Sequence, residues 1–333
     1  MQDLLSRPRR NRRTAVLRGF HRETFLSAQH LVYPLFVHDR TDQGNVPLKS
    51  MPGCQRLCFD GLLEEVAGAR ADGLGAVVLF PAVSDTLKTR DAAEAYNPEG
   101  LVPRAVRALK RDFPGLIVIT DVALDPYNAD GHDGLVADDG RILNDETVEV
   151  LCRQALCHAE AGADLVSPSD MMDGRVRALR RALDGARHTE VGILSYTAKY
   201  ASGFYGPFRE ALDSAPRFGD KKTYQMDPAN GREALRELAL DEAEGADIVM
   251  VKPAGPFLDV IHRLRSQTTL PIAAYQVSGE YAMLKAASQN GWLDERRVVL
   301  ESLLGIRRAG ADLIFTYYAR QAARWLAEGG LDP

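Results

Sequence analysis

The chain has 333 residues, of which 45% are hydrophobic and 26% are charged, and its formal net charge is −5 at pH 7. Such a composition is typical of a globular protein with a large core, and it excludes a general attraction to nucleic acids or anionic membranes. The longest apolar runs, such as 76–80 and 248–251, are far too short to span a bilayer. The four cysteines form no CxxC pair and match no standard zinc module. We therefore expect reduced thiols in a cytoplasmic protein that has neither a nucleic acid nor a membrane as its partner.

Residues 1–30 differ in composition from the rest of the chain. Residues 7–13 read RPRRNRR, and apolar periodicity around them is weak. Such a segment is typical of a solvated tail, of a nucleic-acid patch or of an arm on a neighbouring subunit, and the residues alone leave these open. The N-terminus has no apolar core of a secretory signal, and its arginines keep a transit peptide only as a less favoured alternative. We expect an N-terminal arm at 1–30 and one domain at 31–333.

From residue 31 onward, short β-rich runs alternate with amphipathic stretches. Each run is continuously apolar rather than alternating, which indicates strands buried on both faces of a parallel sheet. The predicted strands are 33–37, 76–80, 116–120, 164–168, 191–196, 247–252, 272–277 and 312–317. Helices are expected between them, for example over 60–72, 145–162, 231–245 and 295–309.

Several of these helices end in a small-Gly-Ala turn, such as AGAD at 161–164, that leads into the next strand. Glycine at this place is typical of a helix C-cap followed by a short loop. Eight strand-helix units of these lengths predict a closed (β/α)8 barrel. The alternative is a doubly wound open sheet, which usually has fewer strands and often a glycine-rich phosphate loop after its first strand. The chain contains neither GxGxxG nor GxxxxGK[ST], so we expect no nucleotide or other organic cofactor.

Two long segments, 121–144 and 197–224, follow predicted strands. Long loops in a compact domain are usually functional, and barrel enzymes carry their active sites at the carboxyl ends of the strands. We therefore expect one catalytic mouth, formed by polar residues that close or follow the strands. These residues are Asp121, Ser167, Ser169, Lys199, Lys252, Ser278 and Tyr317.

Two of these residues are lysines at neighbouring strand ends. Lys252 ends the apolar run DIVMVK, and Lys199 lies just past the end of the strand before it. Singly, Lys252 could extend its ammonium into solvent and Lys199 could be an exposed loop lysine. Facing the same cavity, however, each charge disfavours the ammonium form of the other and leaves a nucleophilic amine. The pair predicts an enzyme that forms Schiff bases with its substrate.

The two long segments carry further charged groups. Segment 203–222 combines glycines, the aromatic residues Phe204, Tyr205 and Phe208, and basic residues that include Arg209 and Lys221. This pattern favours a lid that orders over an anionic substrate, and a solvated basic loop is the alternative. In the other segment the candidate metal ligands are Asp121, Asp125, Asp130, His132 and Asp133. Their oxygens favour Mg²⁺ or a monovalent ion over zinc, although aspartate-rich turns are very often only turns.

Four long strings in the chain resemble the porphobilinogen synthase family, also called 5-aminolevulinate dehydratase. They are SPSDMMDGRV (167–176), YTAKYASGFYGPFRE (196–210), GADIVMVKP (245–253) and YQVSGEYAML (275–284). The resemblance runs through nearly the whole chain, from the arginine-rich arm to AGADLIFTYYA. It implies a (β/α)8 barrel whose N-terminal arm makes inter-subunit contacts, commonly in a homo-octamer. It also implies a lyase that joins two 5-aminolevulinate molecules into porphobilinogen, with loss of two waters, in tetrapyrrole (haem) synthesis.

The resemblance further implies a role for each site residue. Lys252 would form an imine with the substrate that becomes the propionate-bearing half, and Lys199 would form one with the second substrate. The substrate carboxylates would be held by Ser278 and Tyr317 for the first molecule and by Arg209 and Lys221 for the second.

The resemblance also bears on metals. Zinc-using members of the family place three cysteines in the loop after the third strand, where this chain has Ala123, Asp125 and Asp133. The chain therefore resembles the aspartate-containing, zinc-independent variant. In many such members a glutamate 15 residues before the Schiff-base lysine binds an allosteric Mg²⁺, and the matching residue here is Glu237. Considered alone, Glu237 is an ordinary surface charge.

Two other functions compete with this one. A class I aldolase needs one lysine, and it would leave Lys199 unexplained. A non-catalytic barrel with an RNA-binding arm is disfavoured by the net negative charge and by an arm that does not interleave basic and aromatic residues.

Overall fold

The computed structural model describes residues 4–40, 42–212, 217 and 219–330, with the side chains at 209 and 210 outside that description. Eight parallel strands form a closed barrel, because the last strand pairs with the first through Leu31 and Ile314. In barrel order the strands are β1 (Leu31–Val37), β4 (Ala76–Pro81), β5 (Ile117–Val122), β8 (Leu165–Pro168), β9 (Gly192–Lys199), β10 (Ile248–Lys252), β11 (Ile272–Gln276) and β12 (Leu313–Thr316). The predicted (β/α)8 fold is confirmed, and the open doubly wound sheet is excluded.

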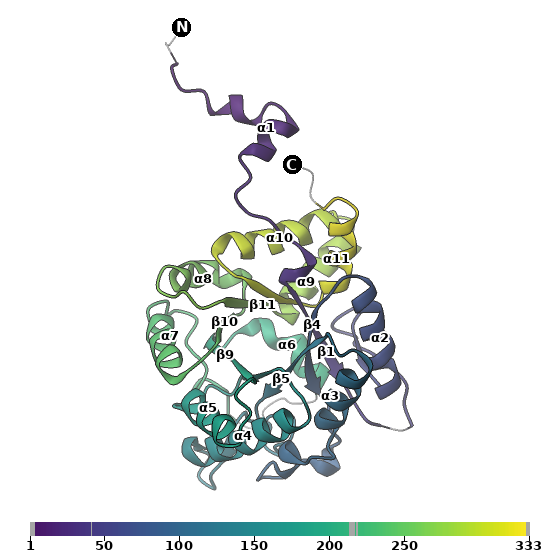
Figure 1. Cartoon of the computed structure of the whole chain (residues 1–333), viewed down its shortest axis with the longest axis vertical. Coiled ribbons are helices and arrows are strands. Elements are labelled where there is room, and N and C mark those ends of the chain that lie inside the picture. Colours follow the sequence, from purple (N-terminus) through teal and green to yellow (C-terminus); the bar gives the residue numbers. More distant parts are fainter. Residues whose placement is uncertain (1–3, 41, 213–216, 218, 331–333) are drawn as a thin grey trace.

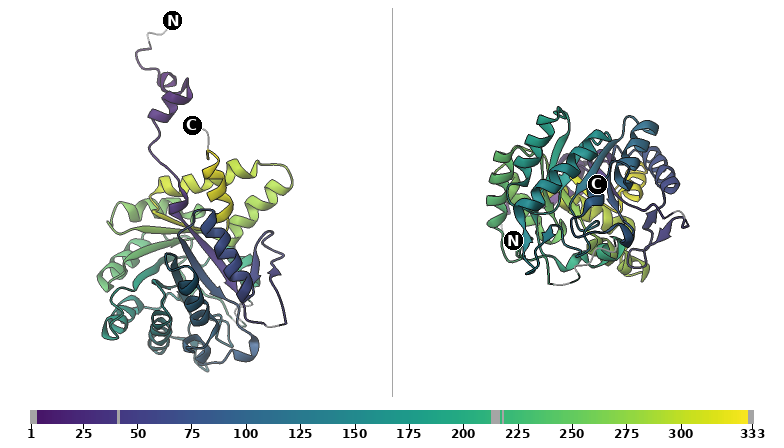
Figure 2. Two further views of the ribbon diagram at one scale, coloured as in Figure 1. Left: turned by 45° about the vertical axis from the view of Figure 1, so that its right-hand side comes forward. Right: turned by 90° about the horizontal axis from the view of Figure 1, so that it is seen from below.

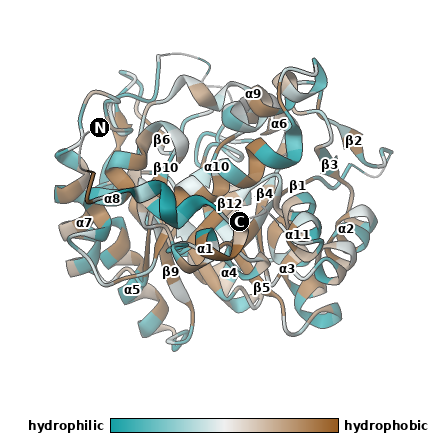
Figure 3. Ribbon diagram, turned by 90° about the horizontal axis from the view of Figure 1, so that it is seen from above, coloured by the Kyte–Doolittle hydropathy of each residue, from teal (hydrophilic) through white to brown (hydrophobic). Residues whose placement is uncertain are grey.

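Helices surround the barrel and cover its outer face (Figure 1). The main ones are α2 (Phe59–Ala71), α3 (Leu101–Asp112), α4 (Asn144–Glu160), α5 (Arg175–Gly185), α7 (Glu233–Glu244), α8 (Leu258–Arg265), α9 (Ser278–Gln289), α10 (Glu295–Ala309) and α11 (Ala319–Ala327). Seen from above, the ribbon is hydrophobic along much of the strands and mixed along the helices (Figure 3). This is the pattern expected of buried strands and of helices with one face in solvent.

Smaller elements lie at the barrel ends. A hairpin of β2 (Val46–Pro47) and β3 (Gln55–Leu57) extends the sheet at β1, and a second hairpin of β6 (Leu135–Val136) and β7 (Ile142–Leu143) lies in the segment after β5. The short helices are η2 (Ala28–His30), η3 (Asp85–Leu87), η4 (Ala93–Tyr96), η5 (Gly203–Tyr205), α6 (Gly206–Leu212) and η6 (Gly255–Phe257).

The small-Gly-Ala turns act as predicted and also have a second function. Gly162, Gly245 and Gly310 take positive φ angles of 102°, 100° and 123°, which glycine adopts most readily. The aspartate two residues after each glycine accepts a backbone N–H at the start of the preceding barrel strand. The pairs are Asp164 with Val118 (2.8 Å), Asp247 with Ile193 (2.7 Å) and Asp312 with Ile272 (2.9 Å). Each turn therefore caps a helix and also joins two strands at the amino end of the barrel.

The N-terminal segment stands away from the barrel on the side of α10 (Figures 1 and 2). It contains η1 (Pro8–Arg12) and α1 (Ala15–Phe20), neither of which has a buried residue. Large apolar side chains are exposed along it, among them Leu5 at 88% and Phe20 at 78%. None of the described helices is long and apolar enough to cross a membrane.

Candidate active site

The two lysines are register partners at the carboxyl ends of adjacent strands. Lys199 is the last residue of β9, and it pairs with Lys252, the last residue of β10. We expected Lys199 in a loop, but β9 continues through residues 197–199 because β10 offers backbone partners up to Lys252. Both side chains are only 5% exposed, so neither lysine extends its charge into solvent.

Lys252 lies inside a cage of aromatic rings. Its Nζ is 4.7 Å from the ring centroid of Tyr275, 4.9 Å from that of Phe208, 5.1 Å from that of Tyr196 and 5.2 Å from that of Tyr205. Burial, with a smaller contribution from the nearby charge of Lys199, lowers the pKa of Lys252 to about 7. Near neutral pH a large fraction of Lys252 is therefore the free amine, which is the nucleophilic form.

Lys199 has polar neighbours instead. Its ammonium donates a hydrogen bond to the backbone carbonyl of Ser169, and it lies 3.7 Å from Oδ1 of Asp133. The two lysines are therefore held in different electrostatic environments within one site.

The aspartates after β5 surround a second cation. Nζ of Lys221 lies 3.3 Å from Oδ2 of Asp125 and 3.1 Å from Oδ2 of Asp133. Burial opposes ionisation of Asp133, yet Lys199 and Lys221 lower its pKa to about 2. The pKa of Lys221 is raised because these two carboxylates outweigh the opposing effect of burial. An internal ammonium thus occupies the place between Asp125 and Asp133.

Asp121 lies at the carboxyl end of β5 and differs from Asp133 in the direction of its pKa shift. Burial, followed by the charge of Asp125, raises its pKa to about 7. Its Oδ1 and the hydroxyl of Tyr196 are buried and have no hydrogen-bond partner among the described residues. Both are therefore available to a bound molecule.

Ser278 and Tyr317 contact residues of the aromatic cage around Lys252. The hydroxyl of Ser278 accepts the backbone N–H of Phe208 at 3.0 Å. The hydroxyls of Tyr317 and Tyr275 are 3.0 Å apart, so Tyr317 joins the aromatic cage through a hydrogen bond. Ser278 therefore holds α6 against the barrel mouth.

The cavity beside the lysines is narrow. The space left free among its side chains is about 30 Å³, room for about two water molecules. The ring of Phe208 packs against Phe36 and Phe80 at centroid distances of 5.6 and 5.3 Å. Because a substrate is larger than this space, its binding requires residues of the wall, such as Phe208 on α6, to move.

Two further site residues were predicted from the sequence. Arg209 belongs to α6, but its side chain is outside the described part of the structure, as are residues 213–216 and 218 of the predicted lid. Glu237 is half-buried on α7 and lines a separate groove of about 610 Å³ with Asp173 and the segment 222–226. Among the residues described, no group of three or more His, Cys, Asp or Glu side chains is arranged to hold a metal ion.

The sequence analysis missed the aromatic cage and also Gln225, which lines the same cavity. A signal for the cage was present. Five of the eight predicted strands carry an aromatic residue near the carboxyl end, namely Phe36, Phe80, Tyr196, Tyr275 and Tyr317. In a barrel these positions converge on the mouth. Gln225 follows no strand and had no such signal.

Known proteins resemble the chain over nearly its whole length. A family model described as delta-aminolevulinic acid dehydratase matches residues 5–325. The chloroplastic delta-aminolevulinic acid dehydratase of Physcomitrium patens is 64% identical over 322 residues, which cover 96% of this chain and 74% of that protein. The Chlamydomonas reinhardtii enzyme of the same name is 59% identical over 335 residues, which cover 98% and 86%. A crystal structure of delta-aminolevulinic acid dehydratase from Toxoplasma gondii, in complex with the reaction product porphobilinogen, superimposes with a TM-score of 0.97 at 54% identity, covering 98% of this chain and 93% of that one.

These relatives correct one expectation. Those from Physcomitrium patens and Chlamydomonas reinhardtii, like the one from rice, are named chloroplastic, so the cytoplasmic location expected from composition is wrong. Composition misled because location depends on a targeting segment that a receptor recognises, and the folded barrel carries no trace of it.

Proposed function

The chain belongs to the delta-aminolevulinic acid dehydratase (porphobilinogen synthase) family and condenses two molecules of 5-aminolevulinate to porphobilinogen in tetrapyrrole biosynthesis, and from this premise we propose that Lys252 and Lys199 each bind one substrate molecule as an imine. One observation carries the proposal. Two buried lysines are register partners at the carboxyl ends of β9 and β10, where barrel enzymes carry out their chemistry.

Lys252 reacts first. Its free amine adds to the ketone carbon of one 5-aminolevulinate, and the ketone oxygen leaves as water. The resulting imine withdraws electrons and makes the adjacent C–H acidic. Asp121 lines the same cavity, and its pKa of about 7 allows it to take up and return a proton near neutral pH.

Lys199 binds the second molecule. Its amine, held by Ser169 and Asp133, adds to the ketone carbon of that molecule, and the ketone oxygen leaves as water. The two bound molecules then react side by side, which converts a bimolecular condensation into an intramolecular one. One C–C and one C–N bond form between them, both ketone oxygens leave as water, and both lysine amines are regenerated.

The substrate carboxylates need partners on opposite sides of the site. We assign Ser278 and Tyr317 to the first molecule, because both lie beside the cage around Lys252. We assign Arg209 and Lys221 to the second, because Lys221 is a cation in the cavity wall near Lys199. To bind the substrate carboxylate, Lys221 must then give up its ion pair with at least one of the two aspartates.

Trapping with borohydride tests the proposal. Borohydride reduces an imine to a stable amine, so peptide mass analysis after incubation with 5-aminolevulinate should show adducts on both lysines. A class I aldolase mechanism would label one of them. Pyrrole formation that survives Lys252→Ala would exclude the mechanism.

The active site works without zinc in this proposal. Ala123, Asp125 and Asp133 offer no thiolate, and the ammonium of Lys221 already supplies a positive charge between the two aspartates. Zinc sites favour thiolate and imidazole ligands, whereas carboxylate oxygens suit harder cations.

We also assign Glu237 to an allosteric Mg²⁺. The residues suit such an ion, because the carboxylates of Glu237 and Asp173 line one groove that has room for a hydrated cation. Mg²⁺ usually keeps several waters and needs only one or two carboxylates from the protein. When bound, the ion would supply charge that favours assembly rather than contact with substrate.

The N-terminal arm is the part of the chain that we assign to subunit contacts in a homo-octamer. Exposed Leu5 and Phe20, together with α1 and its lack of a buried face, suit a segment that another subunit covers.

A further inference from the structure

A buried arginine begins α5, and the helix itself does not explain it. Arg175 is only 3% exposed, and it is the first residue of the helix. The N-terminus of a helix repels a positive charge, and burial removes the water that would stabilise it. The guanidinium must therefore be stabilised by groups outside α5.

The first such group is the turn after β8. Nη1 of Arg175 donates to the carbonyl of Met172 at 3.2 Å, and Nε lies 3.7 Å from Oδ2 of Asp170. Met171, within this turn, has a φ of 67°, which a side chain other than glycine rarely adopts. Such strain persists only where the surroundings impose it. The same turn begins with Ser169, whose backbone carbonyl accepts a hydrogen bond from Nζ of Lys199.

The second group is the strand that carries Lys199. Nη2 of Arg175 donates to Oγ of Ser195 at 3.2 Å and to the carbonyl of Tyr196 at 3.4 Å. Ser195 in turn donates to Oδ2 of Asp241 on α7 at 2.7 Å, and Oδ1 of Asp241 lies 3.8 Å from Arg175. One planar guanidinium thus joins the turn at 169–172 to β9, four residues before Lys199.

We propose that Arg175 is a positioning residue for Lys199. It holds the Ser169 carbonyl and β9 in a fixed relation, so that the amine of Lys199 meets the ketone of the second substrate. Among the described residues, none of its contacts is with β10 or with a ring of the Lys252 cage, because it reaches Tyr196 only through the backbone carbonyl. The placement of Lys252 therefore depends on Arg175 less directly than that of Lys199. This inference rests on the proposed role of Lys199 as an imine former.

Arg175→Lys is the primary test. Lysine keeps the charge between Asp170 and Asp241 but cannot donate to the turn and to β9 at once. We expect the rate of borohydride trapping at Lys199, with saturating 5-aminolevulinate, to fall about tenfold, as for a misplaced reacting group. Trapping at Lys252 should stay within about twofold of the parent, because its supporting contacts are intact. A general loss of stability would lower both rates together.

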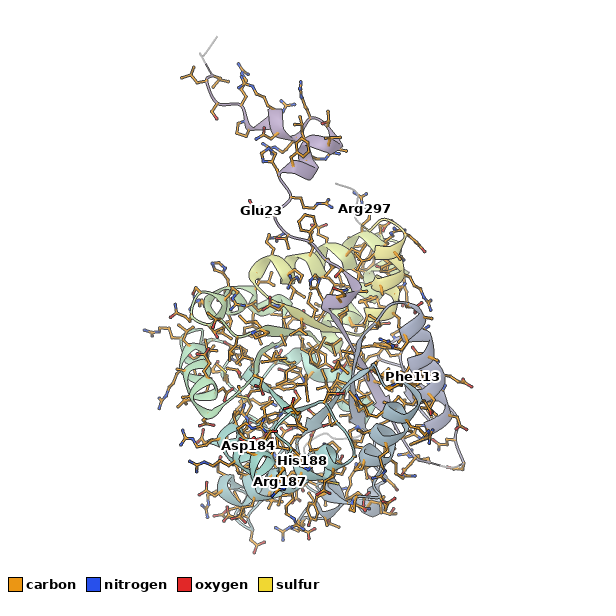
Figure 4. The ribbon with its side chains drawn as sticks, viewed as in Figure 1. Glu23, Phe113, Asp184, Arg187, His188 and Arg297 are labelled. Carbon is orange, nitrogen blue, oxygen red and sulfur yellow. The ribbon has the colours of Figure 1, made fainter. Side chains whose placement is uncertain are left out.

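Arg180→Lys is the matched control on the same helix. Arg180 donates to the carbonyl of Val191 at 2.7 Å, just before β9 begins, and pairs with Asp184 at 2.7 Å. Figure 4 shows Asp184 with Arg187 and His188 at the end of α5. Arg180→Lys loses guanidinium contacts at the amino end of β9, at the opposite end of the strand from Lys199. It should therefore keep the parent ratio of the two adducts.

Ser195→Ala provides a second test if Arg175→Lys does not fold. It removes one link between the guanidinium and β9 without removing a charge, and it should lower the Lys199 to Lys252 adduct ratio in the same direction. An unchanged ratio in whichever of these two variants folds would overturn the inference while leaving the proposed function intact. Absence of either adduct in the parent would overturn the proposed function and the inference with it.

Discussion

The reactivity of Lys252 depends on its surroundings more than on its place in the sequence. Four rings exclude water from its amine, and Lys199 adds a like charge. Below a pKa of about 7 the amine is protonated and cannot attack, and above it the amine is free. The first imine should therefore form about tenfold more slowly for each pH unit below 7 and at a constant rate above it.

Rapid-quench borohydride trapping at Lys252, measured at steps of about one pH unit from pH 5 to 9, would give this profile. Lys199→Met removes the neighbouring charge, so its profile should move to higher pH. A rate that still rises about tenfold per pH unit up to pH 9, as expected for a lysine with the ordinary pKa of 10.5, would contradict the role of burial.

Removal of zinc should have no effect on activity. Lys221 provides the cation between Asp125 and Asp133, and these aspartates replace the thiolates that zinc would need. We expect a zinc-selective chelator to leave pyrrole formation unchanged. Stoichiometric zinc in the loop 121–133, with loss of activity on its removal, would show the prediction to be wrong.

Among the helices, α6 controls entry to the site. The hydroxyl of Ser278 accepts the backbone N–H of Phe208 on α6, and the Phe208 ring lies 4.9 Å from Nζ of Lys252. The free volume beside the lysines is about 30 Å³, so we expect α6 to open for substrate and to close again over it. We expect protease cleavage within 203–222 to slow when levulinate, a substrate analogue, is bound. Limited proteolysis followed by mass analysis measures both rates. Cleavage in the arm at 7–13 is the internal control, and equal slowing there would mean that the ligand acts on the protease or on assembly instead of on a lid.

The aspartates at the amino ends of the strands stabilise the barrel without taking part in catalysis. Asp164 accepts the N–H of Val118 and pairs with Lys110 at 2.8 Å. Asp164→Ala leaves a strand N–H without its acceptor, so the protein should lose about 1–3 kcal/mol of stability. Thermal unfolding would show this as a lower midpoint, while both imines still form. Asp112→Ala removes an exposed pair with Arg111 and should leave the midpoint unchanged.

For the assembled protein, Mg²⁺ should act through Glu237 and not through the substrate. An ion that binds only the larger assembly stabilises it by mass action. We expect Mg²⁺ to raise activity and to shift the size distribution upward in sedimentation velocity. Glu237→Ala should lose both responses while it still forms the imine at Lys252.

Glu149→Ala, an exposed glutamate on α4, is the control for loss of surface charge. It should respond to Mg²⁺ like the parent. If Glu237→Ala also responds like the parent, the ion binds elsewhere.

The sequence by itself determined the barrel and the approximate ends of its strands, although β9 continues to Lys199, three residues beyond its predicted end. Continuous apolar runs must be buried on both faces, glycine is needed where a helix stops in a left-handed turn, and eight such units close on themselves. It also placed Lys252 at a strand end, because an apolar run stops there. These properties are local, so a short stretch of residues suffices to show them.

Only the tertiary structure decided what the site residues touch. Lys221 lies between Asp125, 96 residues earlier in the chain, and Asp133, 88 residues earlier, and Arg175 connects a turn after β8 to Ser195 on β9. The cage around Lys252 comes from three separate parts of the chain, at 196, at 205–208 and at 275. Such contacts form only when the barrel closes, and the pKa values follow from them because burial and charge separation are properties of the folded molecule. Sequence patterns therefore show which residues can carry the chemistry, and the closed barrel sets the protonation state in which each one works.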